Sequence, residues 1–427
     1  MASSKKPARD PVAYLLLAVM LINLPGAVTV LTQSPGRAAD GHTGSLLVYP
    51  FALAFSLYLL GRYLRLSSLS GSYLAFLAFF TTYLGVAVVF SLINEDLNES
   101  DFIVFNMYAF QLLFISAIYF WLAQLGREDL EVCLRFSKKI LLLASLGMLF
   151  SPFLTYYQAN AADRAGGFFI DQNQAAFAVL YCLVLVAVYP AQRPLIALVE
   201  AGIATSAVML TFSRTGLLVF IVLCGLYLLS RRSVGQVVLS LVGFAAVFLL
   251  LWATFEYDLV HLNFEQRQRL EDVAAILSGE TIQKTYDQRA ILFDIGLHRI
   301  AEQLPWGAGI GKFHEMEYGV RHQPTGHWLG VHNAYLLILG EAGLAGFIAF
   351  LGFWAVAFWK MAQPSEYRGL AIGLTVVMFS SMMTTHAVFN YKVSAIMLAV
   401  VIALTARPAE RDHRYRARQA SLSPSTP

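Results

Sequence analysis

Three histidines recur at five-residue intervals late in the chain, at His322, His327 and His332. The third differs from the other two because Asn333 and a long apolar run follow it directly. This position predicts a partly shielded imidazole at a membrane boundary, where a pKa near the ordinary value of about 6.5 suits proton transfer. A proline and two glycines interrupt the series, so we expect a general base at His332 rather than a zinc site.

An arginine lies at the tight outer turn between two apolar runs, in the sequence Ser213-Arg214-Thr215-Gly216. A guanidinium in a membrane segment costs about 2.5–3.5 kcal/mol at mid-bilayer and less near the surface. A bidentate contact with a phosphate group would offset that cost. The alternative is a side chain that extends to the lipid headgroups without a ligand, and the residues alone leave both explanations open.

A second arginine, Arg289, falls in the first turn of an expected helix. A cation opposes the helix dipole at that position unless an anion is bound beside the exposed N–H groups. An ion pair with Asp287 or Asp294 is the alternative explanation. A third arginine, Arg164, lies in a segment rich in glycine and phenylalanine, residues 163–174, that we expect to dip into the membrane interface.

Acidic side chains on the predicted outer surface give little sign of a metal site. Glu315, Glu317 and Asp171 are the candidate ligands for a divalent ion, and they form no paired-acid motif. We therefore expect metal-independent chemistry without a cofactor. The glycine run at 305–311 lacks the Lys-Ser/Thr pair of a phosphate-binding loop, so a structural turn is expected there.

The elements that must position these residues are membrane helices. Hydrophobic residues make up 58% of the 427 residues, charged residues 13%, and the mean hydropathy is +0.61. Soluble domains carry about one quarter charged residues, so the composition predicts an all-α polytopic membrane protein. About twelve runs are candidate transmembrane helices: 12–32, 44–61, 72–94, 102–125, 140–157, 175–190, 194–212, 215–230, 235–257, 333–359, 369–388 and 391–406.

The distribution of lysine and arginine predicts the orientation. With the N-terminus inside, the cytoplasmic segments hold 19 of the 30 basic residues and the short outer loops hold 4. The other 7 lie in a long loop, 258–331, which the count places outside. The first run is expected to be an uncleaved helix rather than a signal peptide, because it is long and lacks a clear cleavage site. Cys133, Cys182 and Cys224 imply no disulfide framework.

This topology divides the chain into four parts. Residues 1–257 would form nine transmembrane helices with short outer loops, and residues 258–331 would form a partly helical periplasmic loop. Capping patterns at Asn263 and Thr285 predict two helices in this loop, ending near Leu277 and Gln303. Residues 332–406 would form three more transmembrane helices. The basic tail, 407–427, is expected to anchor on anionic membrane lipids and not to bind nucleic acid.

Three motifs, taken in order, resemble those of the O-antigen ligase family, a branch of a larger superfamily of ligases and polymerases. The motifs are a loop with Arg164, Gly167, Phe169 and Asn173, the turn Ser213-Arg214-Thr215-Gly216, and the segment 332–336 followed by 341–346. Arg289 and the glycine run lie between the last two motifs, as in the family. The resemblance covers about 164–350. Asp171 departs from it, because the family often has a proline shortly before the asparagine.

The resemblance implies a glycosyltransferase at the outer face of the bacterial inner membrane. Its donor would be a glycan on undecaprenyl diphosphate, and its acceptor the core oligosaccharide of lipid A. His332 would deprotonate or orient the acceptor hydroxyl, and Arg214 and Arg289, with Arg164, would bind the diphosphate. Direct displacement would invert the anomeric centre.

Other functions remain open, two within the same superfamily and one in a different class. O-antigen polymerases and protein O-glycosyltransferases share the superfamily and differ in their acceptor. A membrane transporter of a small anion or a lipid-linked sugar would use the same arginines for binding alone. Removal of His332 would change affinity in a transporter, whereas in a transferase it would abolish turnover while donor binding survives.

Overall fold

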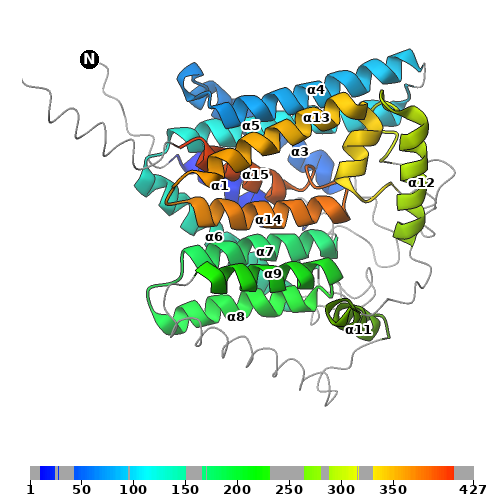
Figure 1. Cartoon of the computed structure of the whole chain (residues 1–427). Coiled ribbons are helices and arrows are strands. Elements are labelled where there is room, and N and C mark those ends of the chain that lie inside the picture. The colour runs from blue at the N-terminus through cyan, green and yellow to red at the C-terminus, as the bar shows by residue number, and fades with distance from the viewer. Residues whose placement is uncertain are drawn as a thin grey trace, which may run out of the picture. The chain divides into compact units, whose positions relative to one another are not determined.

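The computed structural model describes residues 10–24, 27, 43–94, 97–150, 166–169, 171–230, 264–279, 288–314, 316 and 330–407 (Figure 1). Within these ranges the regular structure is helical, and no strand occurs. Three helices are long and apolar enough to cross a membrane: α4 (Gly71–Ile93), α5 (Glu99–Gln124) and α13 (Ala334–Ala362). These helices are those of an all-α membrane protein, while the figure of twelve spans stays a prediction.

The other helices fill most of the predicted runs. They are α1 (Pro11–Leu21), α3 (Thr43–Tyr63), α6 (Arg127–Phe150), α7 (Gln172–Val188), α8 (Pro194–Leu210), α9 (Arg214–Ser230), α11 (Phe264–Ser278), α12 (Gln288–Gln303), α14 (Arg368–Thr384) and α15 (Lys392–Thr405), with a 3₁₀ turn, η1 (Leu66–Ser68). The predicted span 235–257 lies outside the described residues. The two helices predicted in the long loop are confirmed as α11 and α12.

The chain folds into two compact units, and helix α6 contributes to both. Unit 1 comprises residues 1–20, 46–136 and 286–427, and unit 2 comprises residues 21–45 and 137–285. The long predicted loop is therefore divided, because α11 belongs to unit 2 and α12 to unit 1. Each unit is described separately below.

Helix α15 forms the centre of unit 1. All of its residues are buried, and it packs against α4, α5, α13 and α14. A helix that is apolar on every face is stable only when other elements surround it, which explains why its sequence shows no polar face. Helix α13 lies along α4, as Figure 1 shows, and Phe79 contacts Phe350 and Phe353 across this interface with ring centroids 5.2 and 6.2 Å apart.

A kink in α13 joins two of the sequence motifs into one structural feature. Gly343 has φ 58° and ψ −156°, so the helical hydrogen bonding is interrupted there. The glycine run after the cis peptide bond to Pro305 fills the gap, and a side chain on Gly307 would collide with the carbonyl of Glu341. Three backbone hydrogen bonds close the junction: Ala308 N to Gly340 O (2.7 Å), Gly309 N to Glu341 O (3.1 Å) and Leu344 N to Pro305 O (2.9 Å). The glycine run is thus a structural turn.

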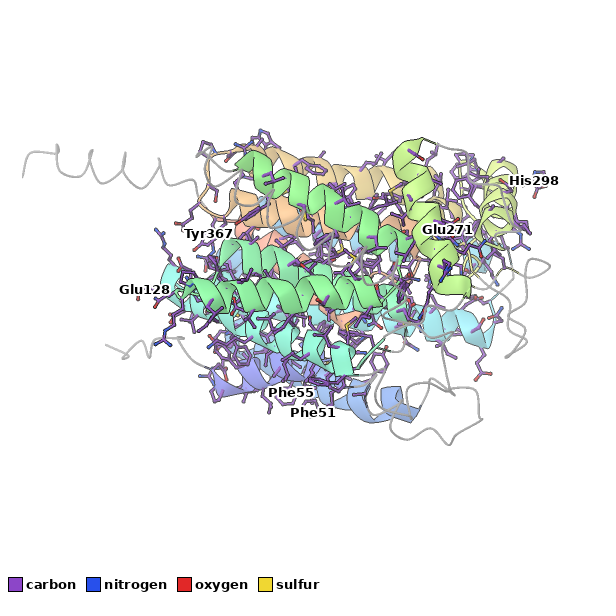
Figure 2. The ribbon with its side chains drawn as sticks, turned by 90° about the horizontal axis from the view of Figure 1, so that it is seen from below. Phe51, Phe55, Glu128, Glu271, His298 and Tyr367 are labelled. Carbon is purple, nitrogen blue, oxygen red and sulfur yellow. The ribbon has the colours of Figure 1, made fainter. Side chains whose placement is uncertain are left out.

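The two ends of unit 1 are distinct. Figure 2 shows Glu128 and Tyr367 at one end and His298, on α12, at the other. Arg127 and Arg407 lie at the first end, in segments that the charge distribution assigns to the cytoplasm, and the orientation in the membrane stays a prediction. Arg127 pairs with Glu366 (2.7 Å), and Arg407 donates to the carbonyl oxygens of Leu122 and Leu125 (3.2 and 2.9 Å).

Unit 2 is built on α7, α8 and α9, which pack against one another, with α11 against α9. Gly216 permits the close approach of α9 to α7, since a Cβ there would lie 3.0 Å from the Cβ of Ala176. An ion pair ties α6 to α8: Lys138 Nζ lies 2.7 Å from a carboxylate oxygen of Glu200 and also donates to Tyr189 O at 2.9 Å. Both charged side chains are largely buried, at 5% and 14% exposure.

Candidate active site

His332 is held on both sides along the backbone. Its neighbour Val331 donates from its N–H to Phe313 O at 3.1 Å. On the other side the Asn333 side chain caps α13 by accepting from Tyr335 N and Leu336 N at 2.9 and 3.1 Å. His332 itself has φ 47°, which is uncommon for a residue with a side chain and is maintained only where the surroundings fix it. The imidazole, half-buried, therefore projects from a rigid point at the start of a membrane helix.

Two further histidines surround this imidazole, and the sequence interpretation did not identify them. The ring of His386 lies 5.3 Å from that of His332, and the ring of His314 lies 5.0 Å from that of His386, measured between centroids. His314 follows the glycine run, and His386 lies in the connection between α14 and α15. Three segments far apart in the sequence thus bring their imidazoles into one cluster.

Burial determines the charge of the two added histidines. Burial lowers the pKa of His314 to about 4. Burial also lowers the pKa of His386 well below its ordinary value, and the neighbouring His314 and His332 lower it further. At neutral pH both side chains are therefore uncharged imidazoles, and that of His386 lies beside His332. Within the described part of the chain, His386 Nδ1 is enclosed and has no hydrogen-bond partner.

The cluster continues inward through two tyrosines to a buried carboxyl group. His314 Nε2 lies 3.0 Å from the hydroxyl of Tyr108, whose ring contacts that of Tyr83 edge-on at 5.5 Å. The Tyr83 hydroxyl donates to Glu341 Oε2 at 2.5 Å. Glu341 has no exposed surface, and its other oxygen accepts from the N–H of Phe313 at 3.2 Å. We call this series the His332–Glu341 chain: His332, His386, His314, Tyr108, Tyr83 and Glu341.

The segment that carries His314 is fixed by its contacts with α4 and α5. Ile310 N donates to Ser91 Oγ at 2.8 Å, and Lys312 Nζ pairs with Asp101 at 2.9 Å. Gly311 has φ 82°, and a Cβ there would lie 2.5 Å from an oxygen of Asp101. These contacts explain why the glycines are spaced as they are and why His314 cannot move independently of the helices.

Arg214 lies in unit 2 at the first position of α9. Its Nη1 is 3.1 Å from Asp272 Oδ2 on α11, and its side chain keeps 38% exposure. The adjacent Ser213 caps the helix by accepting from Gly216 N at 3.2 Å, and its hydroxyl donates to Asn173 Oδ1 at 3.0 Å. Two predicted motifs, the 213–216 turn and the loop with Asn173, are therefore in contact.

The exposure of Arg214 matters for its chemistry. An ion pair between partly exposed groups contributes about 0–1 kcal/mol, so a stronger anion can displace the carboxylate. A diphosphate carries more charge than Asp272 and accepts two parallel hydrogen bonds from a guanidinium. Arg214 can therefore bind a phosphate group after exchanging its partner.

Several predicted residues cannot be placed in this way. Arg289 is the second residue of α12, but its side chain lies outside the described residues, and so does Arg164. The same holds for His322, His327, Glu315 and Glu317. Asp171 is described: it caps α7 by accepting from Asn173 N at 2.9 Å. No group of three or more His, Cys, Asp or Glu residues in the described ranges could hold a metal ion, and metal independence stays a prediction.

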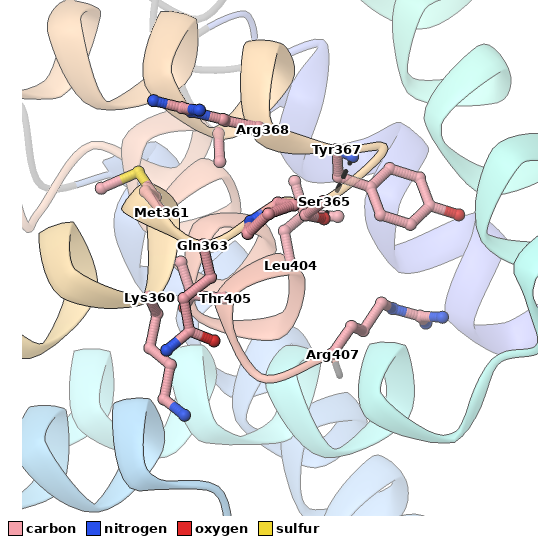
Figure 3. Close-up of a pocket in the computed structure, with 11 residues that line it drawn as sticks. Lys360, Met361, Gln363, Ser365, Tyr367, Arg368, Leu404, Thr405 and Arg407 are labelled. Carbon is pink, nitrogen blue, oxygen red and sulfur yellow. Dashed lines mark hydrogen bonds between the residues drawn. The ribbon is translucent and has the colours of Figure 1, made fainter. Parts of the chain in front are cut away.

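A small pocket lies at the opposite end of α13 from His332 (Figure 3). Its lining includes Lys360 at the end of α13, Arg368 at the start of α14 and Arg407 beyond α15. Its volume of about 20 Å³ has room for about one water molecule and not for a sugar. The chemistry predicted at His332 therefore does not involve this pocket.

A comparison with known families bears on these observations. Residues 199–351 match the family model described as O-Antigen ligase, a segment that includes Arg214, Arg289, His332 and Glu341. The resemblance to this family is thus confirmed over 199–351, while the loop with Arg164 and Asn173 lies outside the matched segment, and the family comprises glycosyltransferase-like ligases and polymerases. No curated protein sequence and no solved structure matches the chain. His386, Tyr83 and Tyr108 lie outside the matched segment.

Proposed function

From the match of residues 199–351 to the O-antigen ligase family, we propose that the chain is an O-antigen ligase. It transfers O-antigen glycan from undecaprenyl diphosphate to the core oligosaccharide of lipid A. The reaction takes place at the periplasmic face of the bacterial inner membrane, where both lipid-anchored substrates reach the outer ends of the helices. The reaction needs no metal ion or cofactor.

The observation that carries this proposal is the fixed position of His332. Its backbone is held by Val331 and by the Asn333 cap, while the half-buried imidazole has neutral histidines on its inner side. A base must be unprotonated before it accepts a proton and must be held within reach of the hydroxyl. The fixed backbone at the head of α13 meets the second requirement and supports His332 as the base for the acceptor.

The reaction is a direct displacement at the anomeric carbon of the donor. The acceptor oxygen forms a bond to this carbon as the bond to the diphosphate oxygen breaks, and undecaprenyl diphosphate leaves with the electron pair. The acceptor proton passes to His332. Because the diphosphate is a stable anion, its departure requires cations rather than a general acid. A single displacement inverts the anomeric configuration.

Arg214 is proposed to bind the diphosphate, supported by its exposure and its exchangeable partner Asp272. Arg289 is proposed for the same ligand from its place in the first turn of α12, where the helix dipole favours an anion. Arg164 is proposed to supply additional positive charge. The partners of the protein are then the two lipid-linked substrates and the surrounding membrane lipids, without nucleic acid.

Complementation separates the ligase from its relatives. The gene should restore lipopolysaccharide carrying O-antigen in a ligase-null bacterium and should not restore chain lengthening in a polymerase-null one. The ladder of lipopolysaccharide on a gel reads both outcomes. Restoration only in the polymerase-null strain would assign a polymerase. Glycosylated protein without modified lipopolysaccharide would assign a protein O-glycosyltransferase, and uptake without transfer a transporter.

A further inference from the structure

His386 is the member of the His332–Glu341 chain that lies between the proposed base and the interior of unit 1. Its ring is 5.3 Å from His332 on one side and 5.0 Å from His314 on the other. The connection that carries it is anchored, since the ring of Phe389 packs 5.6 Å from that of Phe80 and Ala387 N donates to Thr385 Oγ1 at 3.1 Å. The position of His386 is therefore determined as firmly as that of His332.

The chemistry of His386 differs from that of a residue that only fills space. Its Nδ1 is enclosed without a hydrogen-bond partner in the described ranges, although buried nitrogen and oxygen atoms are nearly always paired. Burial keeps the ring neutral, so one of its two nitrogens is an acceptor. A neutral acceptor next to a base that becomes a cation can stabilise the charged form.

The inner part of the His332–Glu341 chain determines how the histidine ring of His314 is oriented. Tyr108 contacts His314 Nε2 at 3.0 Å, and Glu341 with Tyr83 completes the series at a carboxyl group with no exposed surface. The hydrogen bond at one nitrogen of an imidazole determines which nitrogen carries the proton. The orientation of His314 is therefore fixed, and its ring packs edge-on against that of His386 with centroids 5.0 Å apart.

We propose that His386 is a positioning residue for His332: it orients the imidazole toward the acceptor hydroxyl and stabilises the imidazolium formed when the proton arrives. This role rests on the proposed transferase function. No additional reactant is needed, because the proton moves from the acceptor oxygen to His332, and His386 accepts a hydrogen bond from the protonated ring. Tyr108 acts one step further away by holding His314.

The test compares two replacements of His386 in the full-length protein, with release of undecaprenyl diphosphate as the readout. His386→Phe keeps the bulk and removes the acceptor. It should lower kcat by about 10- to 100-fold, the loss typical when an outer partner that orients an imidazole is removed, and leave KM within about twofold. His386→Gln retains an acceptor oxygen and should keep kcat within about threefold to fivefold of wild type, on the same reasoning.

Matched controls and a double substitution distinguish positioning from packing. His298 is exposed on α12 and pairs with Glu302, so His298→Phe and His298→Gln should leave kcat unchanged. In a His332→Ala background, His386→Phe should cause no additional loss, because its effect passes through His332. Tyr108→Phe removes one oxygen without changing shape and should lower kcat by about threefold to tenfold, as a more distant partner. It serves as the test if His386→Phe does not fold.

Three results would overturn the inference. One is wild-type kcat in His386→Phe, or in Tyr108→Phe where that variant is the test. Another is equal loss in His386→Phe and His386→Gln with a lower Tm in both, which would assign a packing role. The third is an additive loss in the His332→Ala background. If wild-type protein releases no undecaprenyl diphosphate with any acceptor, the proposed function fails and the inference falls with it. In the three preceding cases wild type is active, so the function stands.

Discussion

His332 in unit 1 and Arg214 in unit 2 each lie at the same kind of capped helix start. The residues that pack around the two side chains are different. Each side chain lies at the start of an apolar helix, next to a short polar residue that caps it, Asn333 or Ser213. Each turn contains a residue with positive φ, His332 at 47° and Phe212 at 46°. The local sequence therefore builds the same kind of helix start twice.

The contrast lies in the partners. His332 is next to the neutral imidazole of His386, and behind that lie His314, two tyrosines and a fully buried carboxyl group. Arg214 is next to an ionisable carboxylate and keeps 38% exposure. A rigid, neutral environment suits a group that must accept a proton in one geometry. A partly exposed ion pair suits a group that must exchange one anion for another. The same helix start thus serves two different tasks.

The largest expected effect is at His332. His332→Ala should lower turnover by about 10²–10⁴-fold, the usual contribution of a general base, while donor binding and expression remain near wild type. His298→Ala, at an exposed position on α12, is the control and should have no effect. His322→Ala and His327→Ala should cost far less. Equal losses at His322, His327 and His332, or zinc in the purified protein, would contradict the assignment of a base.

The next largest effect is at Arg214. Arg214→Lys keeps the charge but loses the planar fork, so activity should fall by about 10- to 100-fold, corresponding to about 1.5–3 kcal/mol for a charge-assisted hydrogen bond. Donor titration with purified protein checks it. Arg289→Lys should lose less, because a point charge beside a helix N-terminus is sufficient there. Near wild-type activity in Arg214→Ala would remove the diphosphate role.

A smaller effect is expected at Asp272, the partner of Arg214, where a substitution should improve donor binding rather than weaken it. Asp272→Asn removes the competing carboxylate and should lower the KM for the donor by about twofold to fivefold, because the guanidinium of this pair keeps 38% exposure and solvent screens the attraction. Glu271→Gln, at the neighbouring position on α11, should leave KM unchanged. A higher KM in Asp272→Asn would mean that the carboxylate orients the guanidinium rather than competing with the donor.

The smallest expected effect is that of metal removal. Transfer by purified protein should continue in excess EDTA, because the acceptor is activated by an imidazole and the leaving group is bound by arginines. The measurement is turnover with and without EDTA. Loss of activity that magnesium or manganese restores would instead make Glu315, Glu317 and Asp171 candidate ligands.

Much of the fold could be predicted from local sequence, because apolar runs and capping residues act over a few positions. Asn333 before an apolar run predicted the start of α13 correctly, and the glycine run predicted a turn. The pairing of that turn with the kink at Gly343 could not be predicted, since it depends on backbone atoms that lie far apart along the chain.

The same distinction applies to the candidate site. His332 was recognisable from its place at the head of a membrane helix. His386 has a comparable signal, a histidine at the end of an apolar run, but its proximity to His332 requires α14 and α13 to be placed side by side. Tyr83 and Tyr108 resemble ordinary core aromatics in the sequence. Only the three-dimensional contacts show that they connect His314 to Glu341.

The ion pair between Lys138 and Glu200 has a consequence for how the protein is made. An ionisable residue in a membrane helix opposes insertion by the translocon, most strongly near the helix centre. Lys138 is synthesised before Glu200, so α6 can offer a partner when α8 enters the bilayer. We predict that Lys138→Met reduces insertion of α8 in a glycosylation-mapping assay and that adding Glu200→Gln restores it. Unchanged insertion in Lys138→Met would show that α8 enters the membrane without this partner.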